Sequence, residues 1–412
     1  MDKRQWSPKA AWVLIGVLCA AQVFVQIGAF FWPALLPRMM PLWKLSNSEA
    51  GWITASFYGA YMLAVPILVT LTDRIDPKRI YLLGVGLTVI GHTAFALMAD
   101  GFASAMLLRA LTGIGWAGTY MTGLKLLADR VDAKTMSRAT AAHAASIGIS
   151  GALSFVTGDL LATWAGWQSA FFVAGATAAI AWVLIALVVP RGKPAGSNAK
   201  GLFNFGPVFR NRSAMAYAFV YAIHTLEMSA LRGWAVVFLG FVAIETGTAG
   251  QISPALVATL LGLAGTLASV AGNEAAIRFG RRLLISTAVL GSVVFAILVG
   301  TVGPQSYSLA VVLLGVYGIV IWLDSSSLTA GTAGSAEPSR RGATLAVHSM
   351  LGYAGGFVGP LIIGFVLDLG GGMSRTSWAL AFMSVAALML LALIVFWWLN
   401  PNELEGDKNR RV

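Results

Sequence analysis

The sequence predicts an all-α integral membrane protein whose twelve transmembrane helices form two pseudo-symmetric six-helix bundles. Three observations support this prediction. Of the 412 residues, 58% are hydrophobic and only 11% are charged, whereas a soluble domain has about 25% charged residues. Apolar runs of about 20 residues, the length that spans a bilayer, follow one another along the chain. The second half of the chain repeats features of the first half in the same order.

The first apolar run covers residues 12–36 and follows a short basic N-terminus. It is longer than the apolar core of a signal peptide, and no small-residue cleavage site follows it, so we expect it to remain as the first span. The other spans expected in the first half cover residues 49–71, 80–99, 103–128, 139–162 and 169–189. Six more are expected at residues 213–240, 252–277, 282–303, 307–331, 343–367 and 377–399.

Residues 190–212 are expected to link the two bundles on the cytoplasmic side. This stretch is rich in Gly, Pro, Ser and Lys, which cannot build a hydrophobic core. The expected domains are therefore an N-terminal bundle at residues 1–189, this linker, a C-terminal bundle at residues 213–400 and a cytoplasmic tail at residues 401–412.

The net charge of +11 is explained by membrane topology rather than by a surface that binds nucleic acid. Most of the 28 Lys and Arg residues lie at the two termini and in alternate loops, as the positive-inside rule requires of cytoplasmic segments. Only Arg38, Lys44 and Arg375 fall in external loops, and Arg109 and Arg232 fall within spans. We therefore expect a multi-pass protein of the inner (cytoplasmic) membrane with both termini in the cytoplasm.

The two halves share histidines, loop charges and aromatic residues at matching positions. The segment from Arg138 to His143 precedes a glycine-containing helix, and so does the segment from Arg341 to His348. The sixth and twelfth spans each begin with a Trp that a Phe follows four residues later. Because charges and aromatic residues recur in order, the similarity goes beyond what two apolar helices share by chance.

Two motifs connect this architecture with a known family. Residues 69–79, between the second and third spans, read Val-Thr-Leu-Thr-Asp-Arg-Ile-Asp-Pro-Lys-Arg, similar to the major facilitator loop signature Gly-x-Leu-x-Asp-Arg-x-Gly-Arg-Lys. Residues 109–117 in the fourth span are similar to the Arg-x-x-x-Gly-x-Gly-x-Ala pattern of the same superfamily. The chain resembles the major facilitator superfamily over essentially its whole length, although Val69 and Asp76 replace two signature glycines. The resemblance implies the major facilitator fold, with spans one, four, seven and ten around a central cavity.

The resemblance also implies gating residues. Asp73, Arg74 and Lys78 match the signature loop, which in the family latches the cytoplasmic side while the cavity faces outward. Glu274 lies at a similar position in the second half, near the cytoplasmic end of the eighth span. The alternative for Glu274 is an ion pair with Arg278, four residues later on the same helix, or with Arg340.

The seventh span carries the densest group of polar residues at membrane depth. His224 and Glu227 are three residues apart, hence on one helix face, and Arg232 lies one to two turns further out. One interpretation is that Glu227 carries a coupling proton or pairs with Arg232, and that His224 contacts substrate or relays the proton. The alternative is a buried network that only ties the seventh span to its neighbours.

Further candidates lie in other spans. Asp324 begins a run of hydroxyl residues in the tenth span, where the family fold would place it near Glu227, and His348 lies in the eleventh span. In the first half, Arg109 lies in the fourth span and Gln26 lies at mid-depth in the first span, while Tyr120 belongs to a set of possible aromatic cavity walls. A permanently charged arginine would favour an anionic or zwitterionic solute.

These residues predict a secondary transporter that works by alternating access on a small organic anion or metabolite and that is coupled to protons. A drug or toxic-compound exporter is an alternative, although the fifth span lacks the Gly-Pro pair usual in drug–proton antiporters. A ligand-sensing receptor (transceptor) is another, but it would normally need a cytoplasmic output domain. No Walker loop, metal-ligand spacing or nucleophile elbow suggests an enzyme.

The expected partners are a small-molecule substrate, protons and the lipid bilayer. The single cysteine, Cys19, excludes an internal disulfide and a cysteine metal cluster. We expect neither a cofactor nor a metal ion, and a monomer that binds no nucleic acid.

Overall fold

The computed structural model describes residues 8–192, 205–248, 252–404 and 407. These residues form helices joined by short turns, and the described part of the chain contains no strand. The predicted all-α membrane fold is confirmed, because eleven helical segments are long and apolar enough to cross a bilayer. Residues 193–204 of the expected linker, and residues 405–406 and 408–412 of the expected tail, lie outside the described residues.

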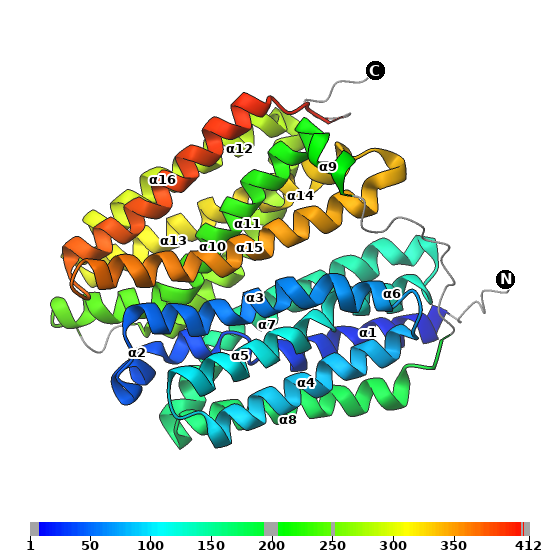
Figure 1. Ribbon diagram of the computed structural model, residues 1–412, viewed down its shortest axis with the longest axis horizontal. Coiled ribbons are helices and arrows are strands. Elements are labelled where there is room, and N and C mark those ends of the chain that lie inside the picture. The colour runs from blue at the N-terminus through cyan, green and yellow to red at the C-terminus, as the bar shows by residue number, and fades with distance from the viewer. Residues whose placement is uncertain (1–7, 193–204, 249–251, 405–406, 408–412) are drawn as a thin grey trace. The chain divides into compact units, whose positions relative to one another are not determined.

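The first half contains eight helices among its described residues: α1 (Pro8–Gln26), α2 (Phe31–Trp43), α3 (Asn47–Leu71), α4 (Pro77–Met98), α5 (Phe102–Ala117), α6 (Tyr120–Ala128), α7 (Ala133–Ala165) and α8 (Trp167–Val188) (Figure 1). The expected fourth span is divided between α5 and α6 because the helix breaks at Gly118 and Thr119. Neither piece reaches the length of a full span, so the fourth span is absent from the eleven.

The second half contains α9 (Gly206–Arg210), α10 (Arg212–Glu245), α11 (Pro254–Phe279), α12 (Arg281–Thr301), η1 (Gly303–Gln305), α13 (Tyr307–Leu323), α14 (Ser325–Gly334), η2 (Pro338–Arg340), α15 (Arg341–Leu369) and α16 (Arg375–Leu399). By its contacts the chain divides into two compact units, Met1–Leu35 with Ser56–Asn198 and Leu36–Ala55 with Ala199–Val412. Residues 36–55, from α2 and the start of α3, thus pack with the helices of the second half.

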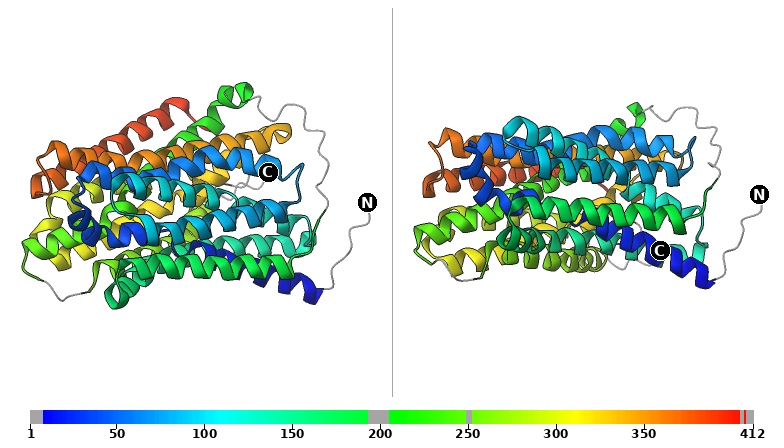
Figure 2. Two further views of the ribbon diagram at one scale, coloured as in Figure 1. Left: turned by 60° about the horizontal axis from the view of Figure 1, so that its bottom comes forward. Right: turned by 90° about the horizontal axis from the view of Figure 1, so that it is seen from below.

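The same helix pairing recurs within each unit. In the first unit α1 packs on α7 and α4 packs on α8; Figure 2 gives two further views of the helices. In the second unit α10 packs on α15 and α12 packs on α16. Each unit therefore pairs its first span with its fifth and its third span with its sixth, which is the internal repeat that the sequence predicts.

Glycines bring α10 and α15 into close contact. A Cβ atom at Gly355 would overlap the carbonyl of Ala222, and a Cβ atom at Gly359 would overlap the carbonyl of Leu226. Small residues let membrane helices approach until their backbones touch. The Thr225 hydroxyl then reaches across and donates to the Gly352 carbonyl at 2.6 Å. This contact fixes the two helices that carry four of the candidate site residues, three on α10 and one on α15.

Asp407, which follows α16, is bound to the helices of the second unit. Arg281, at the start of α12, is buried and donates from Nε and Nη2 to the two carboxylate oxygens of Asp407, each at 3.1 Å. Its Nη1 donates to Asn273 Oδ1 at 3.1 Å and to the Ser327 carbonyl at 3.0 Å. All three guanidinium nitrogens are therefore satisfied inside the protein.

We expect Asp407→Ala to destabilise the protein by about 3–5 kcal/mol, because it leaves the buried Arg281 charge without its counter-ion. Thermal unfolding of the purified protein in detergent measures the effect. Glu337→Gln is the matched control, since Glu337 forms an exposed ion pair with Arg340, and such pairs contribute at most about 1 kcal/mol. Equal unfolding temperatures for the two variants would contradict the prediction.

Candidate functional site

The second unit buries a cluster of titratable side chains around α10. His224 and Glu227 lie on one face of this helix, and both side chains are about 1% exposed. Asp324 Oδ1 lies 2.9 Å from His224 Nδ1. Glu227 Oε1 accepts a hydrogen bond of 2.8 Å from the Tyr317 hydroxyl. The structure thus brings together the candidates His224, Glu227 and Asp324, as the interpretation of the seventh and tenth spans requires.

Asp324 is positioned by a break in its helix. α13 ends at Leu323 and α14 begins at Ser325, so Asp324 is the residue between them. At this point α11 approaches closely, because a Cβ atom at Gly272 would overlap the Leu323 carbonyl. A glycine at the contact lets the two backbones touch and leaves the carboxyl of Asp324 buried beside α10.

Several polar atoms in this cluster have no hydrogen-bond partner among the described residues. They include Glu227 Oε2 and His224 Nε2. His224 Nδ1 and Asp324 Oδ1 are close, but their geometry is not that of a hydrogen bond. A buried polar atom without a partner costs about 1–3 kcal/mol, so these atoms are available to a proton, a water molecule or a polar solute. Packing alone would be served more cheaply by apolar side chains.

His348 joins the cluster through a stack of rings. The Tyr221 ring stacks on two imidazoles, with its centroid 3.9 Å from that of His348 and 5.8 Å from that of His224. The two ring nitrogens of His348 lie 3.1 Å and 3.2 Å from the hydroxyls of Thr332 and Thr329. His348 on α15 is therefore held in one orientation next to the α10 residues.

Arg232 lies beside an aromatic ring of the same cluster. Its Cζ atom is 4.9 Å from the centroid of the Trp322 ring, within the range of a cation–π contact. The Trp322 ring in turn packs edge-on to His224, with 6.4 Å between the centroids. Arg232 is only partly buried, so its permanent charge borders the cluster.

Arg109 in α5 of the first unit donates to the Ala29 backbone carbonyl, which has no helical donor because residue 33 is proline. In a regular helix the Ala29 carbonyl would accept from the N–H of residue 33, but Pro33 has none. α1 ends at Gln26 and α2 begins at Phe31, and Arg109 Nη2 donates to the Ala29 carbonyl at 3.0 Å. The guanidinium is about 2% exposed.

The rest of the Arg109 guanidinium faces an aromatic surface. Its Cζ atom lies 4.6 Å from the centroid of the Phe57 ring, and Phe57 stacks on Trp116 at 5.2 Å. Nε and Nη1 have no hydrogen-bond partner among the described residues. These N–H groups point to different sides of the guanidinium, so each can donate to a separate acceptor, such as an oxygen of an anion.

Gln26 and Tyr120 make their contacts with α7. Gln26 accepts from Gln22 Nε2 at 3.3 Å and donates from Nε2 to the Ile147 carbonyl at 3.4 Å. The Tyr120 ring stacks on His143 with 5.6 Å between the centroids. These two candidates are therefore placed in the packing of α1 and α6 against α7.

The candidate gating residues Asp73 and Lys78 form contacts with other helices of the first unit. Asp73 pairs with Lys125 at 3.3 Å, Arg74 is exposed, and Lys78 Nζ donates to the Ala186 carbonyl at 2.7 Å. Asp76, which replaces a signature glycine, caps α4 by accepting from the Lys78 N–H at 3.0 Å. It also accepts from the Gly192 N–H at 2.9 Å. The carboxylate that replaces the signature glycine thus links the start of α4 to the segment after α8.

In the second half, Glu274 and Arg278 form an exposed ion pair of 2.9 Å between Oε1 and Nε. This is the same-helix pair named as the alternative to a gating contact.

Sequence reasoning missed Tyr317 and the anchor of Arg109. Tyr317 precedes Asp324 by seven residues, which is two helical turns, so the spacing places both on one side of the tenth span. That spacing would have been enough to suggest Tyr317. The Ala29 carbonyl, by contrast, became an acceptor only through Pro33 and the fold, and no motif marks it.

Comparison with known proteins identifies the family. The model of the Major Facilitator Superfamily matches residues 14–254 and 234–411. The MFS-type transporter YceJ of Bacillus subtilis (strain 168) is 23% identical over 363 residues, covering 82% of this chain and 85% of the relative. The sphingosine-1-phosphate transporter SPNS2 of Xenopus tropicalis is 23% identical over 417 residues, covering 96% of this chain and 81% of the relative.

Solved structures show the same fold. A bacterial homologue of the human lysosomal transporter Spinster, in an inward-facing unoccupied conformation, matches with a TM-score of 0.78 at 15% identity, covering 99% of this chain and 100% of that chain. A variant of the nucleoside transporter NupG matches with a TM-score of 0.79 at 14% identity, covering 94% and 100%. The chain therefore belongs to the Major Facilitator Superfamily and is a secondary transporter of a solute.

Proposed function

We propose that the protein is a proton-coupled transporter of a small organic anion, working by alternating access as a monomer in the inner membrane with both termini cytoplasmic. The observation that carries this proposal is the buried cluster of Glu227, His224 and Asp324. Apolar packing would hold α10 in place at lower cost, so titratable groups at this depth argue for a function that uses their protons.

The carboxyl groups of Glu227 and Asp324 differ in the partners that surround the oxygen that would accept a proton. Glu227 keeps one oxygen, Oε2, without a hydrogen bond of good geometry, although the buried Ser292 hydroxyl lies near the carboxyl, while Tyr317 holds the other oxygen. Asp324 faces the imidazole of His224 at 2.9 Å, so the ring nitrogen competes for any proton that it receives. We assign Glu227 as the proton carrier and keep Asp324 as the second candidate. His224 and His348 would exchange protons with the acids or contact the solute.

The permanent charges favour an anion as the solute. Arg109 offers Nε and Nη1 next to the rings of Phe57 and Trp116. Such a surface suits an anionic group attached to an apolar or aromatic body. The relative SPNS2 is named a transporter of sphingosine-1-phosphate, an amphipathic phosphate ester, so compounds of that kind belong among the candidates beside small carboxylates.

Uptake into proteoliposomes tests this proposal. The panel contains carboxylates, amphipathic phosphate esters and cationic drugs, each measured with and without an imposed pH gradient. We expect an anion to accumulate only with the gradient, and a protonophore to abolish accumulation. Gradient-driven transport of cationic drugs alone would favour a drug exporter, and saturable binding without transport would favour a receptor.

A further inference from the structure

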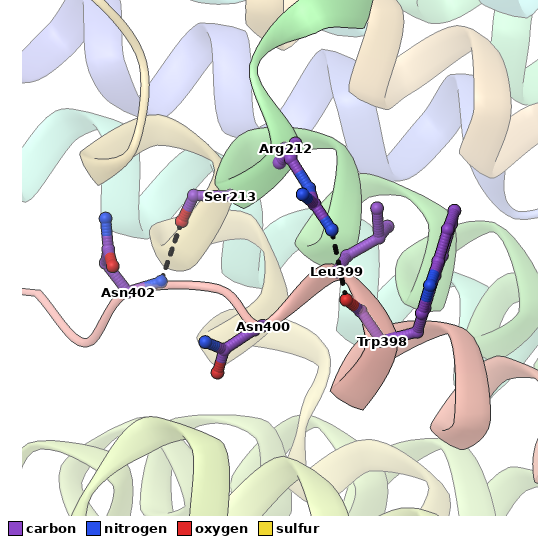
Figure 3. A pocket seen from close by; sticks show the side chains of 6 residues that line it. All are labelled: Arg212, Ser213, Trp398, Leu399, Asn400 and Asn402. Carbon is purple, nitrogen blue, oxygen red and sulfur yellow. Dashed lines mark hydrogen bonds between the residues drawn. The ribbon is translucent and has the colours of Figure 1, made fainter.

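A recess of about 420 Å³ opens where the end of α16 meets the start of α10. The residues that line it are Arg212, Ser213, Trp398, Leu399, Asn400 and Asn402 (Figure 3). All six belong to the second unit. The recess lies apart from the His224 cluster, near the basic segment that precedes the seventh span.

The chain is fixed around this recess by its own hydrogen bonds. Asn400 ends α16 in the left-handed conformation with φ of 50°, which turns the chain toward α10. The Asn402 N–H then donates to the Ser213 hydroxyl at 3.0 Å, and the Tyr217 hydroxyl donates to the Asn402 carbonyl at 2.8 Å. These bonds use the backbone of Asn402 and leave its side-chain amide at the recess (Figure 3).

Among the described residues, the lining carries donors and no acid. Arg212 Nη2 donates to the Trp398 carbonyl at 3.2 Å, and its Cζ atom lies 5.7 Å from the centroid of the Trp398 ring. The guanidinium is thereby oriented while its remaining N–H groups stay exposed. Two described acids of the tail bind Arg281 instead: Asp407 binds its side chain, and Glu403 accepts from its N–H at 2.8 Å. A guanidinium with amides and no carboxylate matches the oxygens of a phosphate group.

An apolar stripe leads from the recess along α16. Leu391, Ile394 and Trp398 are spaced by three and four residues and share one helix face, and all are exposed. Trp397, next to this stripe, is also exposed and lies under Arg282, with 4.5 Å from Cζ to the ring centroid. Exposed tryptophans beside arginines at a helix end are typical of the membrane–water interface.

We propose that this recess binds the phosphate of an anionic phospholipid, with the acyl chains along the stripe of Leu391, Ile394 and Trp398. Free phosphate shares the headgroup chemistry but has no use for the stripe, which is why we assign the site to a lipid. Basic recesses at the cytoplasmic ends of membrane helices are suited to anionic headgroups, and each basic residue strengthens the binding of an anionic lipid about fivefold. Arg212 lies in a segment that we expect to be cytoplasmic. The proposed lipid would therefore belong to the cytoplasmic leaflet, next to the positively charged loops.

Native mass spectrometry of the purified full chain tests the proposal, with phosphatidylglycerol and phosphatidylcholine of identical acyl chains as the two probes. We expect the wild-type protein to bind phosphatidylglycerol at least tenfold more tightly. Arg212→Gln should weaken phosphatidylglycerol binding about fivefold and leave phosphatidylcholine binding unchanged. Arg375→Gln is the control, because it removes the same charge from the other end of α16.

A second variant and a competitor complete the experiment. Asn402→Ala removes one amide donor without changing charge and should also weaken phosphatidylglycerol binding, and thermal unfolding checks that both variants remain folded. Equal affinity of the wild type for the two lipids, or an unchanged preference in Arg212→Gln, would overturn the proposal. Displacement of phosphatidylglycerol by millimolar inorganic phosphate would also overturn it, because the site would then recognise a free anion.

Discussion

Arg109→Lys is expected to weaken substrate binding at least tenfold although the positive charge is kept. The guanidinium uses Nη2 to hold the Ala29 carbonyl and retains Nε and Nη1 for a ligand. A lysine ammonium is a compact point charge on a flexible stem and cannot hold the carbonyl while it also presents donors in the directions of Nε and Nη1. Initial uptake rates over a range of substrate concentrations measure the effect as a rise in KM.

Pro33→Ala separates the anchoring role of Arg109 from its role toward substrate. Alanine restores an N–H at position 33, which then competes with Arg109 for the Ala29 carbonyl. We expect a smaller rise in KM than for Arg109→Lys, because the full guanidinium is still present. Wild-type kinetics in Arg109→Lys would mean that the charge of Arg109 is incidental to transport.

The fold was predictable because hydropathy and charge are properties of whole segments. The described residues contain eleven helical segments of the length expected from apolar runs, and the repeat of the two halves reappears as equal helix pairing. The breaks inside spans were not predictable in the same way. Gly118 and Thr119 interrupt the fourth span, and Asp324 interrupts the tenth, yet mean hydropathy is insensitive to a one-residue or two-residue interruption.

The site was predictable where one helix determines the geometry. His224 and Glu227 share a face because they are three residues apart, and Glu274 meets Arg278 because they are four apart. Contacts between helices need the fold: the family resemblance placed Asp324 near Glu227, but the distance of 2.9 Å between His224 and Asp324 was not predicted.

Glu227→Gln is expected to abolish pH-gradient-driven accumulation, reducing it at least tenfold to the background of empty liposomes. A proton carrier must gain and lose a proton in each cycle, and glutamine resembles the protonated carboxyl permanently. The amide oxygen can still accept from Tyr317, as Glu227 Oε1 does at 2.8 Å, so the packing of α10 should survive. We therefore expect exchange of internal for external substrate to continue in this variant while net accumulation is lost.

Asp324→Asn and Glu337→Gln complete the comparison. Asp324→Asn removes the charge that faces His224 at 2.9 Å, and we expect it to slow gradient-driven accumulation less than Glu227→Gln does. Glu337→Gln changes an exposed acid that pairs with Arg340 and should accumulate substrate like the wild type. The measurements are radiolabelled uptake with an inside-alkaline gradient and counterflow without one. If Glu227→Gln and Asp324→Asn each retain full accumulation, neither acid carries the proton, and a uniporter or a different coupling ion becomes the better explanation.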